Sequence, residues 1–183
     1  TGNQRRFLLS DQSGGSTVLA KLQSVYSDLE KNGPRVKAVL AELKKKEHEG
    51  YQYEAAQGSF ELLASRIIDG HRAPFELGGF RVITDRRDDG TMISEATIKL
   101  SVDGCEEHTA AEGHGPVDAV NSALRKALNR FFPSLASVRL EDYKVRVLGS
   151  DDGTEARVRV LIESTDGTEV WGTVGVSENE HPD

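Results

Sequence analysis

An internal repeat constrains the fold of this chain more than any other feature of its sequence. The tetrapeptide Asp-Asp-Gly-Thr begins at Asp88 and again at Asp151, which is 63 residues later. The same offset relates the Asp-Gly pairs that begin at Asp103 and Asp166. Self-similarity at a fixed spacing indicates that one structural unit is used twice.

Each repeat unit is expected to hold three antiparallel strands. Apolar residues alternate with polar ones over residues 96–102 and 156–162, and a period of two is typical of half-buried strands. Asp-Gly pairs separate the strands, because glycine supplies the positive φ angle that tight hairpins need. The alternating positions align better at an offset of 62, as Ile98 does with Val160, which predicts one residue gained or lost at a loop or bulge.

The first unit is expected to end in a helix over residues 116–132, whose inner face comprises Val117, Val120, Leu124, Leu128 and Phe131. The second unit should end in the same way, yet the sequence reaches Asp183 soon after the stretch WGTVGV. We therefore expect the second helix to be missing from the chain. The first residue is Thr1 rather than methionine, which indicates a chain cut from a longer protein or processed.

The first third of the chain is predicted to be helical. Apolar residues recur at helical spacing over residues 18–29, 36–43 and 56–67. Pro34 is well placed as the first residue of the second helix. Short helices of this kind make a thin core by themselves, so this section is expected to pack against another part of the chain.

The predicted fold class is α+β, with an N-terminal helical linker subdomain over residues 1–73 and a second domain over residues 74–183. The second domain is expected to contain the repeats, over residues 75–133 and 138–183. They should form a pseudo-twofold arrangement of three antiparallel strands plus a helix, of which the second helix is missing.

Charge and composition exclude several classes of function. The net charge is −7 and no region has a basic excess, which argues against binding to nucleic acids or anionic membranes. Cys105 is the only cysteine, so an intrachain disulfide is impossible and a cytoplasmic protein is expected. No apolar run approaches the roughly 20 residues that span a bilayer, and no signal-peptide pattern opens the sequence.

Glycines and a proline precede the predicted helix, in the stretch GHGPVD that begins at Gly113. Unpaired amides at the start of a helix attract anions. A dinucleotide is not indicated, because Asp118 stands where the fingerprint needs its third glycine and would repel a pyrophosphate. Two interpretations stay open: an ordinary helix start with Pro116 first and Asp118 in the first turn, or a site for a small carboxylate.

The second repeat is expected to have a matching corner over residues 172–177, so that the two corners could face one another around a ligand of both charges. A metal site made by Cys105, His108 and His114 is disfavoured, because their spacing matches no common zinc pattern. No residue is expected to be catalytic, since no grouping of serine, histidine and acid has a supporting context.

Several stretches carry a resemblance to a known family: GNQRR with SDQSG, GYQYEAAQGSFELL, GHGPVDAVNSAL and WGTVGVSEN. Over nearly the whole chain, they resemble the C-terminal part of the 2-isopropylmalate synthase and citramalate synthase family. The stretches GYQYEAAQGSFELL and WGTVGVSEN are similar to the citramalate branch in particular.

The resemblance implies that this segment belongs to a larger acyltransferase. Members of the family have a metal-dependent TIM barrel that condenses acetyl-CoA with a 2-oxo acid, a helical linker, and a regulatory domain that binds an end-product amino acid. The barrel is absent from this sequence, together with its divalent metal and its catalytic residues. The segment is therefore expected to hold no cofactor and to be inactive alone, with the catalytic barrel of the parent chain as its partner.

The resemblance also implies an effector site. In the family the regulatory domain forms a homodimer, and leucine or isoleucine binds near the dimer interface between the repeats. Carried over by motif, the site would comprise Gly113, His114, Gly115, Pro116, Val117, Asp118 and Ala119 in the first repeat, Gly172, Thr173, Val174 and Gly175 in the second, and Tyr143 beside the apolar part. The similarity to the citramalate branch favours isoleucine as the effector. The alternative is a structural dimerisation module that binds no effector.

Overall fold

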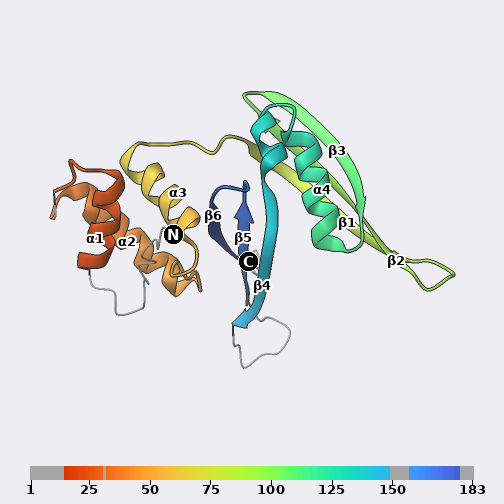
Figure 1. Ribbon diagram of the computed structural model, residues 1–183, viewed down its shortest axis with the longest axis horizontal. Coiled ribbons are helices and arrows are strands. Elements are labelled where there is room, and N and C mark those ends of the chain that lie inside the picture. Colours follow the sequence, from red (N-terminus) through yellow and green to blue (C-terminus); the bar gives the residue numbers. More distant parts are fainter. Residues whose placement is uncertain (1–14, 31, 149–156, 178–183) are drawn as a thin grey trace, which may run out of the picture. The chain divides into compact units, whose positions relative to one another are not determined.

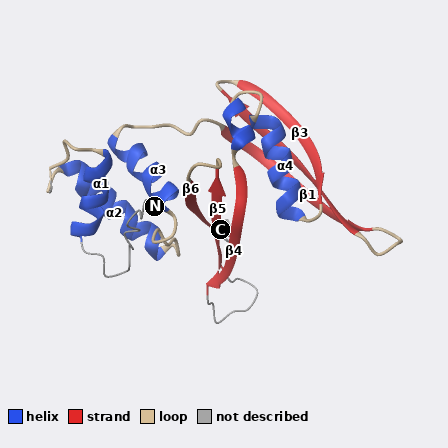
Figure 2. Cartoon of the chain, viewed as in Figure 1, coloured by secondary structure: helices blue, strands red, loops and turns tan. Residues whose placement is uncertain are grey.

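A computed structural model describes residues 15–30, 32–148 and 157–177 of the chain. The first fourteen residues and the second Asp-Asp-Gly-Thr turn lie outside this described part. The elements, shown in Figures 1 and 2, are α1 (Gly15–Val25), α2 (Pro34–His48), α3 (Gln57–Ile68), β1 (Glu76–Arg86), β2 (Met92–Val102), β3 (Cys105–Gly113), α4 (Pro116–Leu128), the short 3₁₀ helix η1 (Pro133–Ser137), β4 (Arg139–Leu148), β5 (Arg157–Thr165) and β6 (Val170–Val176).

Two three-stranded antiparallel sheets confirm the predicted α+β class and the repeat. One sheet has the order β1-β2-β3 and the other β4-β5-β6. Val82 pairs with Ala96 in the first sheet, and its counterpart Val145 pairs with Val160 in the second. Ala96 and Val160 are 64 residues apart, so the strand pairing does not follow the predicted offset of 62. The offset rises from 63 to 64 between the first and second strands of each repeat, which corresponds to one residue gained in the second repeat.

The chain divides into two compact units, which are described separately. One contains residues 72–138, and the other combines the described residues up to His71 with those from Arg139 onward. The predicted domain boundaries, 1–73 and 74–183, stay a prediction. None of the helices in the described part of the chain is long and apolar enough to cross a membrane.

The unit over residues 72–138 is a sheet with one helix on it. Helix α4 begins at Pro116, as predicted, and ends at Leu128, with Arg125 and Lys126 in its last turn near the negative end of the helix dipole. Its buried residues pack against alternate side chains of β2; the fully buried members of this core include Ala96, Ile98, Leu100, Ala119, Ala123 and Ala127. Small side chains on the helix let the backbone of α4 lie close to the sheet.

The predicted inner face of α4 is confirmed except at its first position, since Leu128 is buried and Val120, Leu124 and Phe131 pack against the core. The prediction placed Val117 on that face, but its side chain is 48% exposed, whereas Ala119 is 0% exposed. Val120 is only partly buried against the core. The Thr109 hydroxyl on β3 donates a hydrogen bond of 2.8 Å to the carbonyl of Ala123, which ties the alanine stripe to the sheet.

In the other unit the three helices pack on one another, and α3 packs against the second sheet. Leu22, Val36, Val39 and Phe60 form the centre of its core, and Val174 of β6 packs on them. Helix α3 lies along the edge of the sheet formed by β6. The contact is close, because a Cβ atom added at Gly172 would overlap the carbonyl oxygen of Ala55.

Arginines of β5 tie the same sheet to the end of α2. The guanidinium of Arg157 donates to the carbonyl of Glu49 at 3.1 Å, and that of Arg159 donates to the carbonyl of Gly50 at 3.0 Å. Carbonyls at the end of a helix lack partners within the helix, and cationic donors satisfy them. The helices and the second sheet therefore form one body.

Candidate functional site

The predicted corner before α4 is present in the structure. Strand β3 ends at Gly113, and Gly115 precedes the helix in an extended conformation with φ −170° and ψ 172°. The amide of Ala119 donates to the carbonyl of Gly115 at 3.0 Å. No acceptor within the described part of the chain is found for the amides of Val117 and Asp118. These amides point out of the positive end of the helix and can bind an anionic group.

Asp118 lies beside this opening. Its carboxylate accepts a hydrogen bond of 3.0 Å from the amide of His114, and the Nδ1 atom of His114 lies 3.6 Å from it. The His114 side chain is fully exposed and that of Asp118 is half-exposed. The corner thus presents free amides and an oriented carboxylate side by side, an arrangement that can contact both charges of an amino acid.

Close packing explains the first glycine of the corner. A Cβ atom added at Gly113 would overlap the amide nitrogen of Ala119, whereas no atom lies within 4 Å of the Cβ position at Gly115. Ala119 is fully buried against the sheet, so its side chain faces the core rather than a ligand. Pro116 is exposed at the first position of the helix.

The corner predicted in the second repeat is not a corner. Gly172, Thr173, Val174 and Gly175 lie inside the regular strand β6, where Thr173 pairs with Ile162 of β5. The expectation of a bend was wrong because a glycine in a strand can also serve the close approach of another backbone. Gly172 does so, since Ala55 lies against it.

The pairing registers show where the true counterpart of the first corner falls. Ala111 pairs with Ala96 in the first sheet, two residues before Gly113. Gly113 itself pairs with Ser94. The counterpart of Ser94 in the second sheet is Val158, and the amide of Ser177 donates to the carbonyl of Val158 at 2.8 Å. The counterpart of Gly113 is therefore Ser177, and the residues that would correspond to the start of α4 come after it, outside the described residues.

The two halves of the predicted effector site belong to different compact units, and the structure describes each half by itself. Tyr143 lies on β4 with Val145 and Val147 on the same face of the strand. These side chains are 48%, 57% and 63% exposed, respectively. They form an apolar stripe, which we call the β4 stripe.

Comparison with known proteins identifies the family. Residues 54–180 match the model of the family described as the LeuA allosteric (dimerisation) domain. The chain belongs to this family. This match confirms the resemblance found in the sequence, which predicted relatives among the 2-isopropylmalate synthases and citramalate synthases over nearly the whole chain.

Relatives of this LeuA allosteric domain confirm the citramalate branch. The (R)-citramalate synthases of Geobacter sulfurreducens and Aquifex aeolicus are 51% and 48% identical to it over 179 residues, and each alignment covers 97% of this chain and 34% of the relative. That of a Synechocystis species is 43% identical over 182 residues, covering 97% and 33%. The chain thus spans about a third of the length of the curated relatives it matches.

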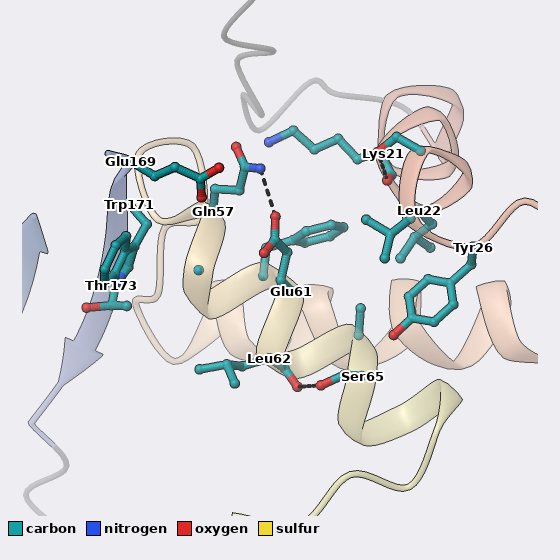
Figure 3. A pocket seen from close by; sticks show the side chains of 15 residues that line it. Lys21, Leu22, Tyr26, Gln57, Glu61, Leu62, Ser65, Glu169, Trp171 and Thr173 are labelled. Carbon is teal, nitrogen blue, oxygen red and sulfur yellow. Dashed lines mark hydrogen bonds between the residues drawn. The ribbon is translucent and has the colours of Figure 1, made fainter. Parts of the chain in front are cut away.

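A pocket in the unit that contains the helices and the second sheet was not predicted from the sequence. It has a volume of about 520 Å³ and lies between α1, α3 and β6 (Figure 3). Its lining includes Lys21, Leu22, Phe60, Glu61, Glu169 and Trp171. Thr173, one of the predicted effector residues, also lines it. The sequence contains no local signal for this pocket, because its walls come from three separate segments.

The pKa values of two side chains that line the pocket, Lys21 and Tyr26, are shifted by their surroundings. Burial lowers the pKa of Lys21, and the negative charge of Glu61 partly opposes this effect. The Nζ atom of Lys21 lies 5.7 Å from the centre of the Phe60 ring. Tyr26 donates a hydrogen bond of 2.6 Å from its hydroxyl to the carboxylate of Asp69, and this bond is the main cause that raises its pKa to about 12.

No cluster in the described residues has the composition of a metal centre. Groups of three or more histidine, cysteine, aspartate or glutamate side chains that could hold an ion are not found among them. Cys105 and His108 are both exposed on β3.

Proposed function

We propose that this chain is the regulatory portion of an acyltransferase that condenses acetyl-CoA with a 2-oxo acid. The (R)-citramalate synthase relatives favour pyruvate as the acceptor and citramalate as the product. Formation of 2-isopropylmalate from 2-oxoisovalerate is the second possibility within the family. The catalytic barrel and its divalent metal belong, in this proposal, to the rest of the parent chain, so the segment has no activity alone.

In this proposal the chain binds the end-product branched-chain amino acid, with isoleucine favoured over leucine, and thereby inhibits the barrel. The family match over residues 54–180 is the observation that carries it. The corner before α4 supplies suitable chemistry: the free amides of Val117 and Asp118 for a carboxylate, and the Asp118 carboxylate for an ammonium group. Binding shifts the population of the parent enzyme towards a less active state.

Calorimetric titration of the folded chain with isoleucine, leucine and valine tests the proposal. Isoleucine should give saturable heat, and it should raise the melting temperature, because a ligand at about 100 times its Kd adds about 2.7 kcal/mol to the stability. Absence of heat with all three amino acids in a folded, dimeric sample would contradict it.

A substitution in the corner locates the site. Gly115→Val should weaken isoleucine binding while leaving the melting temperature nearly unchanged, because the Cβ position is open and the backbone there is extended. Ala136→Val, at an exposed position of η1, is the matched control and should leave the affinity intact. Unchanged affinity in a folded Gly115→Val protein would remove the corner from the site.

A structural dimerisation module that binds no effector is the second candidate function. The β4 stripe favours it, because exposed apolar side chains on one strand face mark an interaction surface. Sedimentation analysis together with thermal melting separates the two functions. A homodimer whose melting temperature does not respond to millimolar isoleucine or leucine would favour the module, whereas a response favours regulation.

A further inference from the structure

We propose that the pocket between α1, α3 and β6 is a small-molecule site that binds a free amino acid with a large apolar side chain through both of its charged groups. This site is separate from the corner before α4, and the proposal goes beyond the effector function argued above. All of its walls belong to the compact unit that contains the helices and the second sheet.

The walls of the pocket are suited to an apolar side chain. Leu22 and Phe60 are almost fully buried beneath it, and Trp171 forms part of the wall contributed by β6. The volume of about 520 Å³ falls within the range of roughly 300–1,000 Å³ that is typical of small-molecule sites. This space accommodates an aromatic side chain rather than only a short aliphatic one.

The cation of the pocket has no anionic partner in contact with it. The Lys21 ammonium lies over the Phe60 ring, and no hydrogen bond from it is found within the described part of the chain. Burial removes part of the hydration of this cation, and no acceptor among the described residues replaces the lost part. A ligand carboxylate placed at Lys21 would supply that acceptor, and a charge-assisted hydrogen bond of this kind is strong.

Carboxylates of the pocket lie close to this cation. Figure 3 shows Lys21, Gln57, Glu61 and Glu169 gathered along one side of the pocket. The Gln57 amide donates to the Glu61 carboxylate at 2.8 Å, which holds that carboxylate in place. A ligand with only negative charge would be repelled by two glutamates, and one with only positive charge by Lys21. A zwitterion satisfies both signs, with its ammonium group at Glu61 or Glu169.

The single tryptophan of the chain provides the readout. Trp171 lines the pocket, so its fluorescence reports occupancy directly. Titration with phenylalanine should produce a saturable change in Trp171 emission. Phenylpropanoate, which lacks the ammonium group, and phenethylamine, which lacks the carboxylate, should each bind at least about tenfold more weakly, which corresponds to about 1.4 kcal/mol.

Lys21→Met is the decisive variant, because it keeps the apolar stem and removes the charge. It should weaken phenylalanine binding at least about tenfold. Lys37→Met, at an exposed position of α2, is the matched control and should bind like the unaltered chain. If Lys21→Met fails to fold, Glu61→Gln tests the same arrangement from the ammonium side and should weaken phenylalanine but not phenylpropanoate.

Several results would overturn the proposal. One is a folded chain whose Trp171 emission does not respond to phenylalanine. Another is an equal affinity for phenylalanine in the unaltered chain and in folded Lys21→Met. Isoleucine heat without any phenylalanine response would leave the effector function standing and refute this site. A phenylalanine response lost in Lys21→Met, in a chain that gives no heat with branched-chain amino acids, would support this site and refute the effector function.

Discussion

The two glycines of β6 carry different constraints. A side chain at Gly172 would overlap the backbone carbonyl of Ala55, which cannot move without displacing the start of α3. Gly175 has no atom within 4 Å of its Cβ position. We expect Gly172→Ala to lower the free energy of unfolding by at least about 1–3 kcal/mol, and Gly175→Ala to change it by less than about 0.5 kcal/mol.

Urea unfolding of the two variants beside the unaltered chain measures this difference. The pair is matched, because both substitutions add the same methyl group to the same strand. Similar midpoints for the two variants would show that the approach of Ala55 to β6 is not as close as described.

Ionisation of Tyr26, which directly follows α1, makes the free energy of unfolding depend on pH in the alkaline range. The hydrogen bond from Tyr26 to Asp69 raises the pKa of Tyr26 from 10.0 to about 12 in the folded chain. A raised folded-state pKa means that this stabilisation is complete below pH 10 and is lost as the pH rises through about 12. Tyr26→Phe should therefore cost up to about 1 kcal/mol at pH 8, with the cost shrinking above pH 10.

Unfolding of Tyr26→Phe and the unaltered chain at pH 8, 10 and 11 measures this cost. Tyr53, whose pKa burial raises to about 12, is retained in both proteins and so cancels in the difference. A cost that stays constant over the whole pH range would exclude the Tyr26 ionisation as its cause.

At the scale of elements, one side chain joins α3 to the sheet. Strand β6 has β5 on one side only, and on its other side the amide of Val174 donates to the Ser59 hydroxyl at 2.9 Å. Ser59→Ala leaves this part-buried amide without an acceptor. We expect a loss of about 1–3 kcal/mol in the free energy of unfolding, with faster hydrogen exchange at the Val174 amide.

Ser65→Ala is the control for this prediction, since its hydroxyl donates only within α3, to the carbonyl of Leu62. It should change the stability by less than about 0.5 kcal/mol. If the Val174 amide exchanged equally slowly in Ser59→Ala and Ser65→Ala, the joint between α3 and β6 would have to lie elsewhere.

The elements that local patterns determine could be predicted from the sequence. Asp103 and Gly104 both have positive φ angles in the β2–β3 hairpin, and Gly167 has one in the β5–β6 hairpin, as the Asp-Gly pairs indicated. The inner face of α4 was predicted in part: Val120, Leu124 and Leu128 pack on the core, whereas Val117 is exposed and the burial of Ala119 was not predicted. The structure buries the alanine, since a small side chain allows the closer approach of helix to sheet.

The sites were harder to predict than the elements, because they depend on contacts between distant segments. The amides at the start of α4 follow from local sequence, and they are where the motif placed them. The role of Gly172 depends on Ala55, more than a hundred residues away, and no strand pattern contains that information. The pocket likewise needs Lys21, Glu61 and Trp171 together, which only the packing of the helices on β6 provides.

The whole molecule consists of two compact units, and the first repeat forms one of them. Residues 72–138 have a core of their own, formed by β2 and α4. A segment with its own core and a self-contained sheet should fold alone. We expect the excised segment 72–138 to show native-like circular dichroism and a single cooperative thermal transition.

A matched pair of isoleucines shows whether the excised segment has the described core. Ile98 is 1% exposed on β2, whereas Ile83 is 39% exposed on β1. Ile98→Ala should destabilise the segment by about 2–5 kcal/mol, through lost burial and the cavity left behind, and Ile83→Ala by less than about 1 kcal/mol. A segment without a cooperative transition, or with equal effects of the two substitutions, would mean that the first repeat depends on the rest of the chain for its fold. Independent folding would instead make this repeat a separable module, on which the corner before α4 can be titrated without the pocket of the other unit.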